Sequence, residues 1–200
     1  LLAGAADPAL APAWTLRPLE REALCVTLGK LRESEGRLLV ESAKFRAAAR
    51  RLTPAVAELR FTYLGPTAQV APLASGERRR QLGLKLRAAD GCNLVYVMWR
   101  IDPKPGLVVS IKSNPGASTH AACGARGYRN VRPSHSTPLA RLQPGDAHVL
   151  RAELEGERLR VLVDGKTVWE GALGAEVLAF DGPVGLRTDN VRMAFDLLAP

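Results

Sequence analysis

The segment Asn114–Pro133 and the two strands predicted before it carry aromatic, guanidinium and amide groups that could bind a sugar. Sugar sites commonly offer a flat aromatic ring to the apolar face of the sugar and planar polar groups to its hydroxyls. Arginine forks also suit carboxylates and sulfates. The alternative is a surface loop whose tyrosine only packs over the domain. The candidate ligand-binding residues are Tyr96, Arg100, Lys112, Arg126, Tyr128 and Asn130.

Motifs for catalysis are missing from the sequence. A retaining glycosidase places two carboxyl groups about 5 Å apart across the scissile bond. Glu153 and Glu155 share one face of a predicted strand, but Gly156 follows at once, which favours the solvated rim of a hairpin. Neither a Gly-x-Ser-x-Gly nucleophile turn nor a phosphate-binding loop is present. The sequence therefore assigns no catalytic residue and favours binding without catalysis.

Two sets of residues raise the question of a metal. Zinc ligands could come from His120, Cys123 and His135, but their spacing matches no common zinc site. Calcium is a candidate near predicted strand ends, where oxygen ligands are supplied by Asp181, Asp189 and Asn190. The alternative is that these three side chains cap turns. We assign no metal ligand and expect no other cofactor.

The chain holds three cysteines. We expect Cys92, at the start of a predicted strand, to pair with Cys123 in a Gly-rich loop. This pairing leaves Cys25 as a buried free thiol in the strand Leu24–Leu28. The alternative is three reduced cysteines in a cytosolic protein.

The net charge of +8 comes from 28 Lys and Arg against 20 Asp and Glu. Such a balance favours acidic partners. The arginines are scattered apart from one run, Arg78–Arg80, and only 5% of residues are aromatic. No stacking motif of the RNA-recognition type is present, which disfavours nucleic acid. The expected partner is a carbohydrate or an acidic polymer of the cell envelope. The composition carries no information on the oligomeric state.

Strand signals recur roughly every ten to fifteen residues, with turn residues between them. Asn93–Ile101 and Leu107–Asn114 each place a row of apolar residues on one face of a predicted strand. Tyr96, Arg100 and Lys112 lie on the faces opposite these rows, and the loop that follows could fold over them. The residues that we expect to be buried between two sheets are Val95, Val97, Trp99, Ile101, Val109 and Ile111.

The remaining elements complete an all-β chain. Turn pairs at Glu35-Gly36, Glu155-Gly156 and Asp164-Gly165 predict hairpins. Residues 114–146 lack periodicity and indicate a long loop. Lys44–Leu52 fits either a helix or a strand, and the sequence leaves this open. The other predicted strands are Glu22–Leu28, Lys30–Ser34, Arg37–Glu41, Glu58–Leu64, Gln81–Arg87, His148–Leu154, Arg158–Val163, Thr167–Gly171, Val184–Arg187 and Val191–Leu198.

These elements predict a two-sheet antiparallel jelly-roll sandwich with at most one or two short helices. Leu1–Asp7 reads like the end of a secretory signal, and residues 6–13 look like a linker. We therefore expect residues 1–13 to be a signal remnant or linker and residues 14–200 to be the domain. No later stretch is apolar enough to span a bilayer. The expected location is secreted, periplasmic or cell envelope.

Four stretches carry hairpin and strand motifs in a recognisable order. Gly29–Val40 is similar to "GxWxVxDGxLxV", with Leu31 in place of the usual tryptophan. Glu58–Tyr63 is similar to "ELRFEF", Arg158–Lys166 to "xIxVYVDGK" and Gly182–Thr188 to "GxIGLRT". Together they resemble the concanavalin A-like domains of the laminin-G and 3-keto-disaccharide hydrolase group, over roughly residues 14–198. The resemblance implies the jelly-roll fold but no activity, because this sandwich hosts lectins, glycosidases and structural domains.

Three hypotheses for function follow. The leading one is an exported, non-catalytic module that binds a glycan or another cell-envelope polymer. The second is a sugar hydrolase of the 3-keto-disaccharide hydrolase type, although no catalytic residue of that group can be carried over to this chain. The third is a purely structural or protein-interaction domain.

Overall fold

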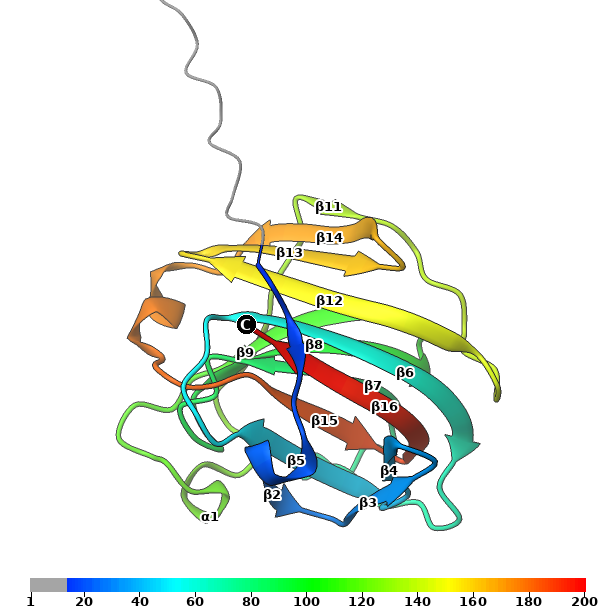
Figure 1. Cartoon of the computed structure of the whole chain (residues 1–200). Coiled ribbons are helices and arrows are strands. Elements are labelled where there is room, and N and C mark those ends of the chain that lie inside the picture. The colour runs from blue at the N-terminus through cyan, green and yellow to red at the C-terminus, as the bar shows by residue number, and fades with distance from the viewer. Residues whose placement is uncertain (1–13) are drawn as a thin grey trace, which may run out of the picture.

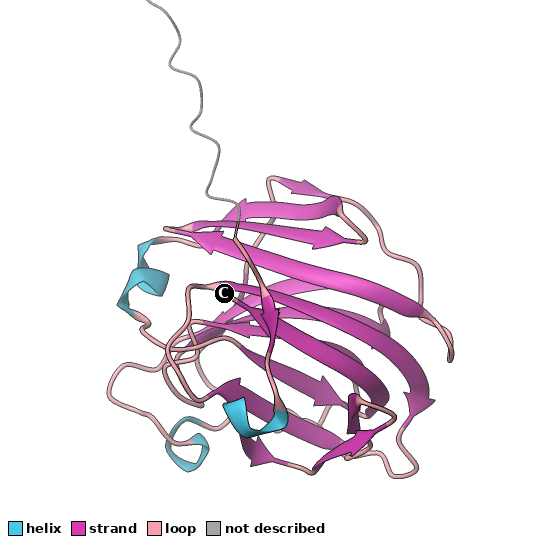
Figure 2. Ribbon diagram, in the orientation of Figure 1, coloured by secondary structure: helices cyan, strands magenta, loops and turns pink. Residues whose placement is uncertain are grey.

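The computed structural model describes residues 14–200, which form two antiparallel β-sheets packed face to face (Figure 1). The predicted signal remnant or linker, residues 1–13, lies outside the described residues. Strands dominate, and the helical elements are short turns (Figure 2). These are η1 (Arg21–Ala23), α1 (His120–Cys123) and η2 (Ala175–Ala179). The all-β, two-sheet jelly-roll prediction is confirmed.

One sheet has nine strands in the order β11-β14-β13-β12-β6-β16-β4-β3, with β1 paired to β16. We call it the nine-stranded sheet. Its strands are β1 (Arg17–Pro18), β3 (Leu31–Ser34), β4 (Arg37–Val40), β6 (Val56–Pro66), β11 (His135–Ser136), β12 (Ala147–Glu155), β13 (Arg158–Val163), β14 (Lys166–Ala172) and β16 (Val191–Ala199).

The other sheet has seven strands in the order β10-β9-β8-β7-β15-β5-β2. We call it the seven-stranded sheet. Its strands are β2 (Leu24–Leu28), β5 (Lys44–Ala49), β7 (Arg80–Leu86), β8 (Leu94–Asp102), β9 (Gly106–Lys112), β10 (Tyr128–Asn130) and β15 (Gly185–Asp189).

Alternating apolar residues of both sheets fill the space between them. All six residues predicted to be buried there are at most 2% exposed. Phe61 of β6 meets Trp99 of β8 edge to face, with ring centroids 5.9 Å apart. Each fully buried large apolar side chain contributes about 1.5–3 kcal/mol of stability, so this shared core holds the two sheets together.

The structure shows whether the segment that the sequence left open is a helix or a strand. Lys44–Ala49 is the strand β5, and its alternate residues Phe45, Ala47 and Ala49 are buried. The helix propensity of alanine and arginine is outweighed by the packing of these side chains against the other sheet. Residues 114–146 are not a continuous loop either. They contain α1 and two short strands, of which β10 extends the seven-stranded sheet beside β9.

The cysteine pairing is as predicted. Cys92 and Cys123 form a disulfide with an S–S distance of 2.10 Å, and Cys25 is free. The prediction that Cys25 is buried is wrong, because its side chain is half-buried. Leu24 fills the core side of β2, so the strand's alternation turns Cys25 towards the outer face of the sheet. No helix within residues 14–200 has the length and apolar character needed to cross a membrane.

Candidate functional site

A groove of about 870 Å³ lies on the outer face of the seven-stranded sheet, opposite the core. Every strand of that sheet contributes to its floor. Loop residues within 73–79, 88–91 and 118–125 line its sides. Cavities of a few hundred to about 1,000 Å³ are typical of small-molecule and saccharide sites.

The strand register orders the floor into rows, because residues paired across antiparallel strands face the same side. One row crosses from β5 to β10 through Ala48, Gly185, Lys85, Tyr96, Ser110 and Asn130. The next row runs from β5 to β9 through Arg46, Arg187, Gly83, Met98 and Val108. Gly185 and Gly83 carry no side chain, so the floor is uncovered beside Lys85 and Arg187.

Two tyrosines form an aromatic platform at one end of the groove. The rings of Tyr96 and Tyr128 stack with centroids 6.0 Å apart and an interplanar angle of 19°. Tyr96 is 5% exposed whereas Tyr128 is 44% exposed. The Arg187 guanidinium lies 4.8 Å from the Tyr96 centroid, and Lys112 Nζ lies 5.2 Å from the Tyr128 centroid. These cation–π contacts fix the platform, and burial raises the pKa of Tyr96 to about 12, which keeps it neutral.

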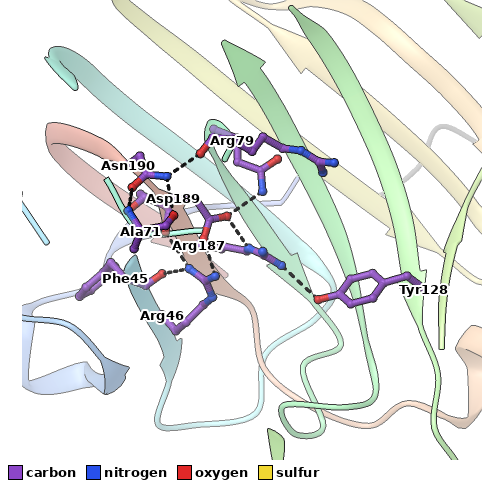
Figure 3. Close-up of polar contacts among 10 residues, drawn as sticks. Phe45, Arg46, Ala71, Arg79, Tyr128, Arg187, Asp189 and Asn190 are labelled. Carbon is purple, nitrogen blue, oxygen red and sulfur yellow. Dashed lines mark hydrogen bonds and ion pairs between the residues drawn. The ribbon is translucent and has the colours of Figure 1, made fainter. Parts of the chain in front are cut away.

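Asp189 organises the charges beneath the groove (Figure 3). Its carboxylate is fully buried and accepts hydrogen bonds from Arg46 Nη2 at 2.6 Å, Arg187 Nε at 2.9 Å and Gln81 Nε2 at 2.7 Å. Burial alone would raise the pKa of Asp189, but Arg187 and Arg46 outweigh it and hold that pKa below its ordinary value. Asp189 is therefore an ionised anchor for two arginines.

Arg187 connects this anchor to the aromatic platform. Its Nη1 donates to Tyr128 Oη at 3.2 Å, so the exposed tyrosine is tied to the buried ion cluster (Figure 3). Asn190, the next residue after Asp189, accepts from the Ala71 backbone N–H and donates to the backbone carbonyls of Ala71 and Arg79. These bonds hold the loop that lines one side of the groove.

Three further cations of the groove floor, on β7, β8 and β9, have no acidic partner among the described residues. Lys85 Nζ donates to the Ala47 carbonyl at 3.3 Å, and Lys112 Nζ donates to the Gly91 carbonyl at 3.0 Å. Arg100 Nε is buried and has no hydrogen-bond partner within residues 14–200. None of the three forms an ion pair with any described residue.

The lining as a whole is basic. Its Lys and Arg residues are Lys44, Arg46, Arg79, Lys85, Arg100, Lys112 and Arg187, and its Asp and Glu residues are Glu77 and Asp90. Glu77 is bound by Arg79, and Asp90 accepts from the backbone N–H groups of Cys92 and Asn93. Burial and then the nearby Lys112 lower the pKa of His120, as expected beside a positive field.

The structure brings together five of the six residues named from the sequence. Tyr96, Arg100, Lys112, Tyr128 and Asn130 all line the groove. Arg126 does not line it. Its guanidinium donates to the backbone carbonyls of Ala122 and Cys123, and so braces the turn after α1.

The polar groove residues that sequence reasoning missed include Arg46, Gln81, Lys85 and Arg187. Arg46 lies on the segment whose helix or strand character was open, so no face could be assigned to it. Arg187 alternates with the buried Leu186 in the Gly182–Thr188 motif, and this parity could have identified it. The strand alternation correctly placed Lys85 and Gln81 on the outer face of the sheet. The sequence did not reveal the groove there, because its sides are formed by loops distant in sequence.

The residues considered from the sequence for catalysis, zinc binding or calcium binding have structural roles instead. Glu153 is bound by Arg151 and Arg160 on the outer face of the nine-stranded sheet, which lowers its pKa despite partial burial. Cys123 is oxidised in the disulfide, and His135 lies on β11 of the other sheet, so no zinc site forms from them. The oxygens of Asp189, considered for calcium, are held by Arg46, Arg187 and Gln81.

The sequence matches no protein-family model, and no curated protein matches it either. Solved structures do share its architecture. The carbohydrate-binding module CBM66 from Bacillus subtilis superposes with a TM-score of 0.58 at 13% identity, over 86% of this chain and 91% of that one. The metal-free carbohydrate recognition domain of Emp46p gives 0.56 at 11% identity, over 88% of each chain.

A beta-1,3-glucanase from Mycobacterium marinum gives a TM-score of 0.52 at 11% identity, over 90% of this chain and 91% of that one. These are concanavalin A-like jelly-roll folds, and this chain has the same fold. At such low identity the likeness establishes the fold alone.

Proposed function

We propose that this protein is a glycan-binding module that acts without catalysis, and that the groove on the seven-stranded sheet is its binding site. The observation that carries the proposal is the aromatic platform of Tyr96 and Tyr128 at a large groove with planar polar groups. Tyr128 offers an exposed ring, and Asn130, two residues further along β10, supplies an exposed amide at the groove. Rigid aromatic surface beside planar hydrogen-bonding groups is what a sugar ring requires.

The carboxyl groups near the groove support binding rather than hydrolysis. Glycoside hydrolysis uses an acid and a second carboxylate on opposite sides of one bond. Glu77 is paired with Arg79, Asp90 caps the turn before β8, and Asp189 is buried under two arginines. No pair of free carboxyl groups therefore faces a ligand from the described part of the chain.

Two further findings are consistent with this proposal. The carbohydrate-binding module and the carbohydrate recognition domain named above share the fold. The Cys92–Cys123 disulfide supports an exported protein, because such bonds persist in oxidising compartments. We infer a secreted, periplasmic or cell-envelope location on this ground.

A glycan array followed by isothermal titration of the strongest hit tests the proposal. Tyr128→Ala should weaken that binding at least about tenfold, because it removes the exposed half of the aromatic platform. Arg60→Ala, on the outer face of the nine-stranded sheet, is the control and should bind as the wild type does.

Three other outcomes would contradict parts of the proposal. Release of sugar products from the bound glycan or from a 3-keto-glucoside, followed by chromatography, would favour a hydrolase. An array without any hit would favour a structural or protein-interaction domain. Unchanged affinity in Tyr128→Ala would show that the glycan does not bind at this groove.

A further inference from the structure

The cations of the groove exceed what the protein's own carboxylates neutralise. Among residues 14–200, Asp189 is the one carboxylate hydrogen-bonded to Arg46 and Arg187, so that buried cluster keeps an excess positive charge. Lys85 and Lys112 are 7% and 1% exposed, and both donate only to backbone carbonyls or sulfur. Buried charges in proteins are usually paired, because desolvation without a counter-charge is costly.

Burial affects the pKa of each of these three unpaired cations. Burial, and then the charges of Arg46 and Arg187, lower the pKa of Lys85 to about 8. Burial likewise lowers the pKa of Lys112 and of Arg100. A guanidinium nevertheless stays protonated in proteins, so Arg100 remains charged with a buried and unbonded Nε. An arrangement of this kind reduces stability unless something else supplies the missing negative charge.

The spacing of these three cations along the strands indicates how long a ligand must be to contact all of them. On β9, Lys112 pairs with Leu94 of β8, and Arg100 lies six residues further along β8. At a rise of about 3.3 Å per residue, the backbone positions of Lys112 and Arg100 are separated by roughly 20 Å along the strand direction. Lys85 lies between them, as the partner of Tyr96 on the other side of β8. One small anion cannot reach all three, whereas a chain with repeated negative groups can.

Resting on the proposed function, we propose that the groove binds an acidic saccharide of several units. Carboxylate or sulfate groups along the saccharide are held by Lys85, Arg100 and Lys112, and Tyr128 stacks on a sugar ring. Carboxylate and sulfate share the chemistry that these side chains recognise, namely anionic oxygens that accept charge-assisted hydrogen bonds.

Three probes of defined charge test this inference by isothermal titration. They are tetragalacturonate, its fully methyl-esterified form and a chondroitin sulfate tetrasaccharide. At least one of the two acidic probes should bind at least about tenfold more tightly than the neutral ester, as expected for one or more charge-assisted contacts. The chondroitin sulfate tetrasaccharide carries sulfates in addition to carboxylates, so tighter binding of this probe than of tetragalacturonate indicates that sulfate contributes to recognition.

Salt dependence of the wild-type protein gives a readout that needs no variant. Binding of the acidic probe should weaken at least about tenfold between 50 mM and 500 mM NaCl, because screening acts on charge pairs. A flat response to salt would overturn the inference.

A matched pair of variants then locates the effect. The double variant Lys85→Met/Arg100→Gln should lose roughly 100-fold in affinity for the acidic probe, about tenfold for each lost contact. Its control is Arg60→Gln/Arg160→Gln, which removes the same two charges from the outer face of the nine-stranded sheet and should leave affinity unchanged. Equal loss in both variants would overturn the assignment to the groove.

Failure of this inference is distinguishable from failure of the proposed function. Array hits confined to neutral glycans, or the failure of both acidic probes to bind more tightly than the neutral ester, would overturn the acidic ligand and leave a glycan-binding module. An array without hits would overturn both.

Discussion

At the scale of single residues, Asp189 decides how much positive charge the seven-stranded sheet can hold. Its carboxylate is fully buried and contacts both Arg46 and Arg187. Asp189→Asn keeps the shape but leaves two buried guanidinium groups without a counter-charge. We expect this variant to lose about 3–5 kcal/mol of unfolding free energy in urea denaturation. Asp181→Asn, at an exposed position, is the control, and a loss below about 1 kcal/mol in Asp189→Asn would contradict the anchor role.

Lys85 gives the protein a pH dependence of stability on the alkaline side. Its pKa is about 8 in the folded protein against 10.5 for a free side chain. Between these values the unfolded chain holds the proton that the folded chain has lost, so unfolding free energy rises with pH in that window. The rise due to Lys85 should total about 3 kcal/mol and should be missing in Lys85→Met.

Comparison of the two proteins isolates this effect from other groups that face Lys85, which are Arg46, Arg187 and Cys25. Urea denaturation at pH 7, 8.5 and 10 should show that the unfolding free energy of the wild type increases relative to that of Lys85→Met as the pH rises. Parallel pH profiles for the two proteins would show that Lys85 is not desolvated as the structure indicates.

At the scale of elements, close strand contact at Gly83 fixes the middle of the seven-stranded sheet. A Cβ placed on Gly83 of β7 would lie 2.1 Å from the Val97 carbonyl oxygen of β8. Gly83→Ala should therefore force the strands apart and cost about 1–3 kcal/mol. Gly91→Ala is the control, since its nearest neighbour would be 3.8 Å away. Equal melting temperatures for the two variants would contradict this account.

At the scale of the whole molecule, the two outer faces of the sandwich differ in charge. The nine-stranded sheet carries Arg60, Arg151 and Arg160 in ion pairs with Glu58 and Glu153, so its charges largely cancel. The groove on the seven-stranded sheet has no such balance. The net charge of +8 is therefore not spread evenly over the protein.

Because stacked sheets lie about 10 Å apart and the screening length is about 8 Å at physiological salt, charge on one outer face acts weakly on the other. Arg60→Gln/Arg160→Gln should thus change affinity for an acidic saccharide less than about twofold at 0.15 M salt. It should also alter stability by about 1 kcal/mol or less, since Glu58 and Glu153 both keep Arg151 as an ion-pair partner. A large loss of affinity would mean that overall charge, not the groove, attracts the ligand.

Local patterns in the sequence were sufficient for most of the fold. Alternation over Asn93–Ile101 and Leu107–Asn114 predicted both the buried face and the outward face on which Tyr96, Arg100 and Lys112 lie. Turn pairs such as Asp164-Gly165 predicted the hairpins. These predictions succeed because the pleat and the turn depend on neighbouring residues alone.

The tertiary structure decided what local patterns do not contain. Packing against the opposite sheet made Lys44–Ala49 a strand and placed Arg46 in the groove, although alanine and arginine favour a helix. Pairing of β15 with both β5 and β7 brought Arg187 and Asp189 to Arg46 and Gln81, more than 100 residues away in sequence. The balance of charges in the groove follows from these long-range strand contacts, which is why the sequence predicted a basic protein but not where its unpaired cations lie.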